Sequence, residues 1–135
     1  MSVRVRFSIE ASVSSTSAEE KDLGNLAMEV VNDTQGEGGV RKTTLAPGAT
    51  DVSVMLTEVT SATFVLIRTN AKDPTETLTA ITIKLDDVGS DPITLTPLSG
   101  STEAHMLLVA SGITDIFASN AGSINIEITV MAVGD

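Results

Sequence analysis

The stretch SINIEITVMA, residues 123–132, decides the fold class because its apolar and polar positions alternate. Apolar side chains occupy every second position from Ile124 to Val130, and Asn, Glu and Thr lie between them. A period of two places successive side chains on opposite faces of a β-strand, so we expect a strand with one buried face. The stretch carries no reactive group, and its purpose must be sought in packing and assembly.

The same alternation, with turn signals between the segments, recurs along most of the chain. Val, Ile and Thr together account for 42 of the 135 residues, a composition that favours strands over helices. Short strands with Gly, Pro, Asn and Asp between them are typical of a sandwich or barrel. We therefore expect an all-β fold, an antiparallel, jelly-roll-like β-sandwich of about eight to ten short strands. The expected strands cover residues 3–10, 40–45, 51–57, 62–69, 79–86, 92–96, 104–110, 113–119 and 123–132.

Residues 17–33 fit either a helix or a strand. Ser17 and Glu20 have the spacing of a helix capping box, and apolar residues follow at helical spacing. Gly24 would cost such a helix about 1 kcal/mol. The residues from Leu26 to Val30 also alternate as a strand would. Because the rest of the chain is predicted to be strand, we favour the strand.

The length of 135 residues is that of one domain. Within it we distinguish an N-terminal strand and loop region, residues 1–39, from a β-sandwich core, residues 40–135. The first region can pack on its own subunit or extend as an arm onto a neighbouring one, because a strand can add to the edge of another sheet. The sequence leaves both arrangements open.

Composition excludes several classes of partner. The chain carries 8 basic and 18 acidic residues, a net charge of −10, which opposes binding to nucleic acids and to anionic membranes. It contains no Cys, so disulfides and thiolate metal sites are excluded. It has three Phe but no Trp or Tyr, the residues on which sugars and unpaired bases usually stack. We expect no nucleic-acid and no membrane partner.

No catalytic set is apparent in the sequence. His105 is the single His, and neighbouring serines, Ser99, Ser101 and Ser111, lack the G-x-S-x-G motif of a nucleophile. We interpret His105 as an ordinary residue of a strand. Two acids that meet in the fold to hydrolyse a glycoside remain open as an enzyme hypothesis, but it is the least favoured one.

Two acidic clusters deserve a test as metal sites. One comprises Asp86, Asp87 and Asp91, and the other Asp73 and Glu76. Neither has the spacing of a calcium loop, and Asp near Gly or Pro is common in turns. We therefore predict no catalytic, cofactor-binding or metal-binding residues and no cofactor.

Two nearly continuous apolar runs, residues 64–67 and 106–110, differ from the alternating strands. Such runs are typical of strands that are covered on both faces, although a short buried helix would have a similar pattern of apolar residues. In a sandwich only one face of each sheet meets the core. The simplest cover for the other face is a neighbouring subunit.

The order of strands and turns over residues 40–135 resembles that of small all-β virion structural proteins of tailed bacteriophages. The resemblance rests on LAPGATDVSVML, FVLIRTN, ITIKLDD, DPITLTPL, HMLLVA, GITDIFASNAG and INIEITVMAVGD. It implies a non-enzymatic structural or assembly protein, located in the virion, that decorates or joins the capsid or tail through subunit contacts. It also implies partners that include itself, as a homo-oligomer with a trimer favoured, and other virion proteins such as the major capsid protein. The alternative is a carbohydrate-binding or adhesin-like β-sandwich module.

Overall fold

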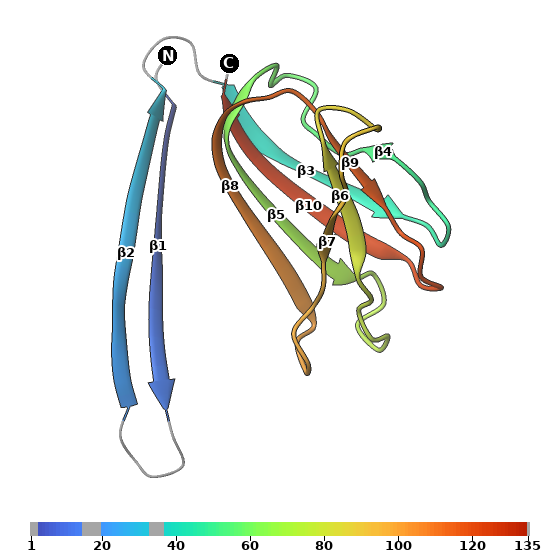
Figure 1. The fold of residues 1–135 in the computed structure, drawn as a ribbon, viewed down its shortest axis with the longest axis horizontal. Coiled ribbons are helices and arrows are strands. Elements are labelled where there is room, and N and C mark those ends of the chain that lie inside the picture. The colour runs from blue at the N-terminus through green and yellow to red at the C-terminus, as the bar shows by residue number, and fades with distance from the viewer. Residues whose placement is uncertain (1–2, 15–19, 33–36, 135) are drawn as a thin grey trace. The chain divides into compact units, whose positions relative to one another are not determined.

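A computed structural model describes residues 3–14, 20–32 and 37–134, and all of the regular structure in these ranges is β-strand. Side chains are described for residues 38–109 and 112–134. The chain divides into two compact units, Met1–Gln35 and Gly36–Asp135, which are considered separately below. Figure 1 labels the ten strands.

The first unit contains one antiparallel hairpin. Strand β1 (Val3–Ser14) pairs with β2 (Glu20–Asn32) from Val3 opposite Asn32 to Ser14 opposite Glu20. The preference for a strand in this region is confirmed over residues 20–32. Gly24 lies next to a shift in register at Ala11 and Ser12, where an irregular strand accepts glycine readily.

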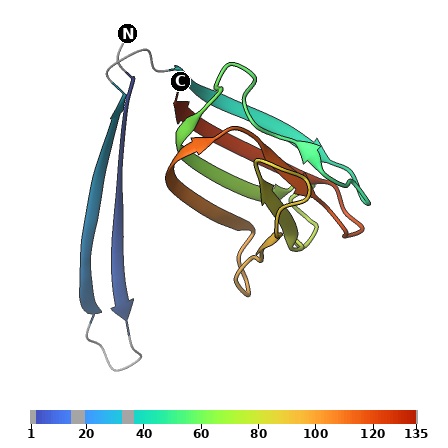
Figure 2. The ribbon, with the colours of Figure 1, turned by 45° about the horizontal axis from the view of Figure 1, so that its top comes forward.

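The second unit is an antiparallel sandwich of two four-stranded sheets, which confirms the expected fold class (Figures 1 and 2). The large sheet has the order β3-β10-β5-β8, and the small sheet has the order β4-β9-β6-β7. The strands are β3 (Glu37–Leu45), β4 (Val52–Ser53), β5 (Ala62–Ala71), β6 (Ile81–Leu85), β7 (Ile93–Leu95), β8 (Glu103–Ile113), β9 (Ile116–Ser119) and β10 (Ile126–Gly134).

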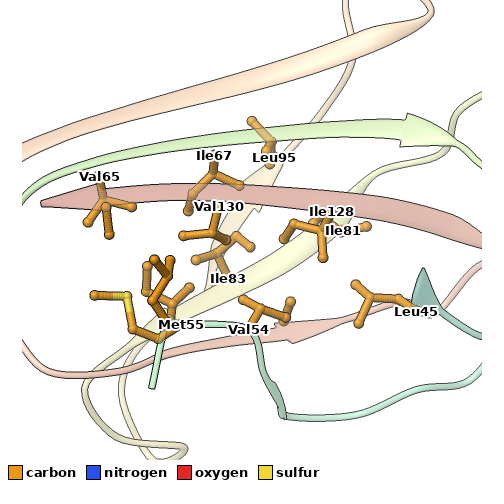
Figure 3. Packing of buried hydrophobic residues seen from close by; sticks show 14 of the residues in the cluster. Leu45, Val54, Met55, Val65, Ile67, Ile81, Ile83, Leu95, Ile128 and Val130 are labelled. Carbon is orange, nitrogen blue, oxygen red and sulfur yellow. The ribbon is translucent and has the colours of Figure 1, made fainter. Parts of the chain in front are cut away.

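Residues 126–132 of the alternating stretch 123–132 lie in β10, which runs on to Gly134 and is a central strand of the large sheet. Ile126, Ile128 and Val130 are fully buried, and the strand lies between β3 and β5. In Figure 3, Ile128 and Val130 lie among side chains from both sheets, with Ile67 from β5 and Ile83 from β6. Removing one such side chain from water contributes about 1.5–3 kcal/mol, so this core is the main stabilising feature of the sandwich.

Most strand boundaries differ from those expected, and the largest differences are at β3, β4 and β8. Strand β3 begins at Glu37, ahead of residue 40, because Gly38 and Gly39 pair with β10 although they contribute no apolar pattern. Strand β4 contains only Val52 and Ser53 of the expected 51–57.

The prediction of a turn at Ser111 and Gly112 is wrong. Strand β8 runs through both residues to Ile113. The register shifts so that Ala62 lies opposite Ile113 while Phe64 lies opposite Val109, which leaves extra residues on β8. Gly112 has a φ of 85°, a conformation that glycine adopts without steric cost and that accommodates such a bulge.

Asn120 connects the end of β9 to the end of β3 and is fully buried. Its Nδ2 donates to the carbonyl oxygens of Leu45 at 3.1 Å, Ala46 at 3.2 Å and Ile124 at 2.8 Å. Its Oδ1 accepts a hydrogen bond from the backbone N–H of Gly122 at 3.0 Å. These hydrogen bonds offset the cost of removing the Asn120 amide from water, and they connect the loop after β3 with the loop after β9.

Candidate interaction surface

The outer face of the large sheet is divided into an apolar and a polar half by the strand register. Met131 on β10 lies opposite both Val40 on β3 and Leu66 on β5, and Leu66 lies opposite Leu107 on β8. The neighbouring row holds Val133, Phe64 and Val109. We call these two rows the apolar half: Val40, Met131, Leu66, Leu107, Val133, Phe64 and Val109.

Burial within the apolar half is uneven. Phe64 and Val133 are buried although they are not part of the main core cluster. Val40 is 56% exposed, Val109 is 48% exposed and Met131 is 37% exposed. Val40 and Met131 are adjacent, and Val109 lies on the same face at the other edge of the sheet. Apolar side chains exposed together on one face are typical of a surface that contacts another macromolecule.

The polar half follows along the same strands. Its first row is Lys42, Thr129, Arg68 and His105, and its second row is Thr44, Glu127, Asn70 and Glu103. Lys42 Nζ lies 3.7 Å from Glu127 Oε1, and Arg68 Nη1 lies 3.9 Å from Glu103 Oε1. Exposed ion pairs of this length contribute about 0–1 kcal/mol each, so this half is a solvated surface with balanced charge.

A hollow of about 300 Å³ lies at the polar end of this face. Its lining includes Arg68, Asn70 and three carboxylates, those of Glu76, Glu103 and Glu127. Glu103 and Glu127 are both engaged by basic side chains, and Glu76 is exposed. The Nε atom of Arg68 is buried without a hydrogen-bond partner in the described structure. These groups can bind a polar molecule through hydrogen bonds, and the three carboxylates leave the hypothesis of a glycoside-hydrolysing acid pair open.

His105 lies on the polar half, directly opposite Arg68. Its side chain is 52% exposed, and its Nε2 lies 3.4 Å from Glu103 Oε2. Of the three serines considered with it, Ser101 donates to the carbonyl oxygen of Glu103 at 2.6 Å. The side chain of Ser111 lies outside those described. Among the described side chains, the contact found for His105 is with a carboxylate.

The two acidic clusters form local turns. Asp73 Oδ1 accepts hydrogen bonds from the hydroxyl and the backbone N–H of Thr75, which hold the pKa of Asp73 below its ordinary value. Asp87 Oδ1 accepts from the backbone N–H of Gly89 at 2.6 Å. These are the Asx contacts that stabilise turns.

Asp86 makes a longer-range connection. Its Oδ1 accepts hydrogen bonds from the backbone N–H and the hydroxyl of Thr114, at 2.6 and 3.1 Å. The backbone bond is the main cause of a lowered pKa at Asp86. Asp86 also has a φ of 64°, a left-handed conformation that Asp and Asn tolerate better than most residues.

Within the described residues, no three His, Asp or Glu side chains are grouped so that they could hold a metal ion. A search of the same residues also finds no helix with the length and hydropathy needed to cross a bilayer.

Comparison with known proteins gives no assignment. No protein-family model matches the chain. No curated protein matches it at a significant level.

Sequence reasoning found part of this surface. The apolar runs at 64–67 and 106–110 contain Phe64, Leu66, Leu107 and Val109, and their second face was expected to need a cover. Val40 and Met131 were missed because Val40 lies alone between Gly39 and Arg41, and Met131 was placed on the wet face of an alternating strand. Only the register shows that the two extend the same row.

Proposed function

We propose that this chain is a non-enzymatic structural subunit that associates with copies of itself in the virion of a tailed phage. There it would decorate or join the capsid or tail and contact other virion proteins such as the major capsid protein. Exposure of Val40, Met131 and Val109 on one sheet face is the observation that carries the proposal. A net charge of −10 keeps the chain soluble. Exposed apolar side chains do not serve solubility, so the patch needs a separate explanation, and contact with another macromolecule is the typical one.

The strand connectivity supports this reading. Counted within the sandwich, the first strand pairs with the eighth, the second with the seventh, the third with the sixth and the fourth with the fifth: β3–β10, β4–β9, β5–β8 and β6–β7. We interpret this nested pairing as that of a jelly roll, a fold found in viral capsid proteins and in lectins. The fold alone does not decide between these functions.

The second candidate function is carbohydrate binding, favoured by the hollow at the polar end. Asn70, Glu76 and Glu127 there offer amide and carboxylate groups of the kind that bond to sugar hydroxyls. The chain has no Trp or Tyr for a sugar ring to stack on. Specific, competable binding on a glycan array, lost in Glu76→Ala, would favour this function.

Two experiments test the proposed function. Light scattering behind size exclusion measures whether the purified protein self-associates, and we expect an oligomer that persists at high salt because the contact is apolar. An antibody raised against the chain should label purified virions from the source lysate on their surface. Absence of label from particles would exclude the virion role even for a protein that self-associates.

A further inference from the structure

Strand β8 forms one edge of the large sheet. Among the described strands it pairs with β5 alone, and Figure 1 shows it as the outermost strand of that sheet. It is 11 residues long. An edge strand leaves half of its backbone N–H and C=O groups free for another strand to pair with.

The other edges of the sandwich are protected in ways that β8 is not. Strands β4 and β7 contain only two and three residues. Strand β3 carries Arg41 and Lys42, and charged residues on an edge discourage pairing. Strand β8 contains no Lys, Arg or Pro, and its single carboxylate, Glu103, lies at its first position.

Burial across β5 and β8 indicates that a neighbouring strand is missing. Leu108 lies opposite Val65, and Met106 lies opposite Ile67, on the core side of the sheet. Val65 and Ile67 are fully buried, whereas Met106 and Leu108 are only partly buried although they pack against the core. One more strand at this edge would complete their burial.

Exposed apolar side chains are also frequent in the chain segment that leads into this edge. Of the six large apolar residues exposed in the described part of the chain, three belong to the segment from β7 to β8. They are Ile93 at 39%, Leu98 at 82% and Val109 at 48% exposure. A partner at the β8 edge would therefore bury apolar surface in addition to backbone hydrogen-bonding groups.

We propose that β8 of one copy pairs antiparallel with β8 of a second copy about a two-fold axis, which joins the two large sheets into one. This inference rests on the proposed self-association and names the contact that produces it. Every copy carries the same open edge, so this contact is self-complementary and closes between two copies. The charge distribution favours this occupant, because antiparallel pairing places Glu103 of the two copies at opposite ends of the contact.

We expect the two copies of β8 to pair over the part of the strand that is free of a bulge. Glu103–Val109 pairs with β5 without a shift, and this stretch is centred on Met106. A two-fold axis at its centre places Met106 against Met106 of the second copy and Ala104 against Leu108 of the second copy. Residues that face the core in one copy then lie opposite residues that face the core in the other copy. The apolar halves of the two outer faces lie side by side.

Disulfide trapping tests this contact directly, because the chain contains no Cys. The test uses the full chain with one substitution at a time: His105→Cys, Met106→Cys, Leu107→Cys and, on the opposite edge, Lys42→Cys as control. Opposed residues of antiparallel strands lie about 4.5–5.5 Å apart between Cα atoms, within the range of a disulfide. We expect rapid formation of a covalent dimer in dilute protein for Met106→Cys, less for its two neighbours and only the slow collisional level for Lys42→Cys.

The outcomes separate this inference from the proposed function. If the unmodified protein is an oligomer by light scattering but none of the three β8 variants cross-links above the control, pairing of β8 is wrong and self-association stands. If the unmodified protein is a monomer at every concentration and no variant cross-links, both are wrong. Circular dichroism of each variant shows that the sandwich is retained, so a missing cross-link cannot come from misfolding.

Discussion

Leu66 on β5 lies directly opposite Leu107 on β8, the strand at the open edge of the large sheet. Both side chains are partly exposed on the outer face, away from the core. Leu66 is also opposite Met131, so it occupies the middle of the apolar half. This position makes Leu66 the best single probe of whether the apolar half is an interface.

We predict that Leu66→Lys weakens self-association by at least about tenfold, which corresponds to about 1.4 kcal/mol. In a contact made through the apolar half, in addition to pairing at the β8 edge, the lysine would place a charge where water is excluded. Sedimentation or light scattering over a dilution series measures the change. Asn70→Lys is the matched control, since it lies on the same strand and face but in the polar half. Equal association of both variants and the unmodified protein would exclude the apolar half as an interface.

Substitution of Asn120 tests the buried connection between the loops. Asn120→Leu keeps a similar volume but leaves the carbonyl oxygens of Leu45 and Ile124 without their side-chain donor. At about 1–3 kcal/mol for each buried group left unpaired, we expect a loss of about 2–5 kcal/mol in the free energy of unfolding. Urea unfolding measures it. Asn125→Leu, at an exposed position, should change stability by less than about 0.5 kcal/mol.

The lowered pKa of Asp86 predicts a pH dependence of stability. A carboxyl group whose pKa is lower in the folded state stabilises the fold above its ordinary pKa, and this contribution is lost as the pH falls through the lowered value. Asp86→Asn keeps a residue that tolerates positive φ but removes the titration. We expect the variant to lose less stability than the unmodified protein between about pH 6 and pH 2 in thermal unfolding. Parallel curves for the two proteins would mean that Asp86 does not contribute.

Gly134 has no space for a side chain. A Cβ atom there would overlap the carbonyl oxygen of Ser61 and lie 2.6 Å from the Cα of Ala62, both backbone atoms. At Gly39 the nearest atom, 2.9 Å away, is the end of the flexible Leu56 side chain. Gly134→Ala should therefore destabilise the sandwich by about 1–3 kcal/mol or more, and Gly39→Ala by clearly less. Similar melting temperatures for the two variants would contradict the close approach of β10 and β5.

Removal of residues 1–35 tests whether the sandwich is an independent unit. The second unit has its own core and two complete sheets, so we expect the shortened chain to keep a cooperative unfolding transition. A second variant lacks residues 1–12 and therefore most of β1. Strand β2 then loses its pairing partner, and even an intact two-stranded hairpin has little stability of its own. If neither deletion alters the oligomer, the hypothesis that residues 1–39 form an arm on a neighbouring subunit is excluded. Loss of the cooperative transition in the shortened chain would contradict an independent sandwich.

The sequence predicted the fold class because alternation is a local property that a single strand displays. Residues 123–132 indicated a strand with one buried face, and Ile126 and Ile128 are indeed buried in β10. Gly112 was misread because glycine is compatible with both a turn and a bulged strand, and only pairing with β5 decides between them. The role of Asn120 has no local signal, since its partners at Leu45 and Ala46 are distant in the chain.

The candidate surface could be predicted only in part, for the same physical reason. The run from Phe64 to Ile67 indicated that one strand has apolar residues on both faces. Which other residues extend that surface depends on register, and a shift of one residue would move Met131 to the core side. The open edge at β8 depends on strand order, which alternation does not encode.

The most direct test of self-association is the solution mass of the 135-residue chain, by light scattering behind size exclusion over a wide range of concentration and at high salt. Pairing of β8 predicts a salt-resistant dimer or an even multiple of it. A trimer, which the resemblance to virion proteins favours, would support self-association and overturn the two-fold contact at β8. A monomer under all conditions would contradict the central claim, because the exposed apolar side chains would then need no second copy.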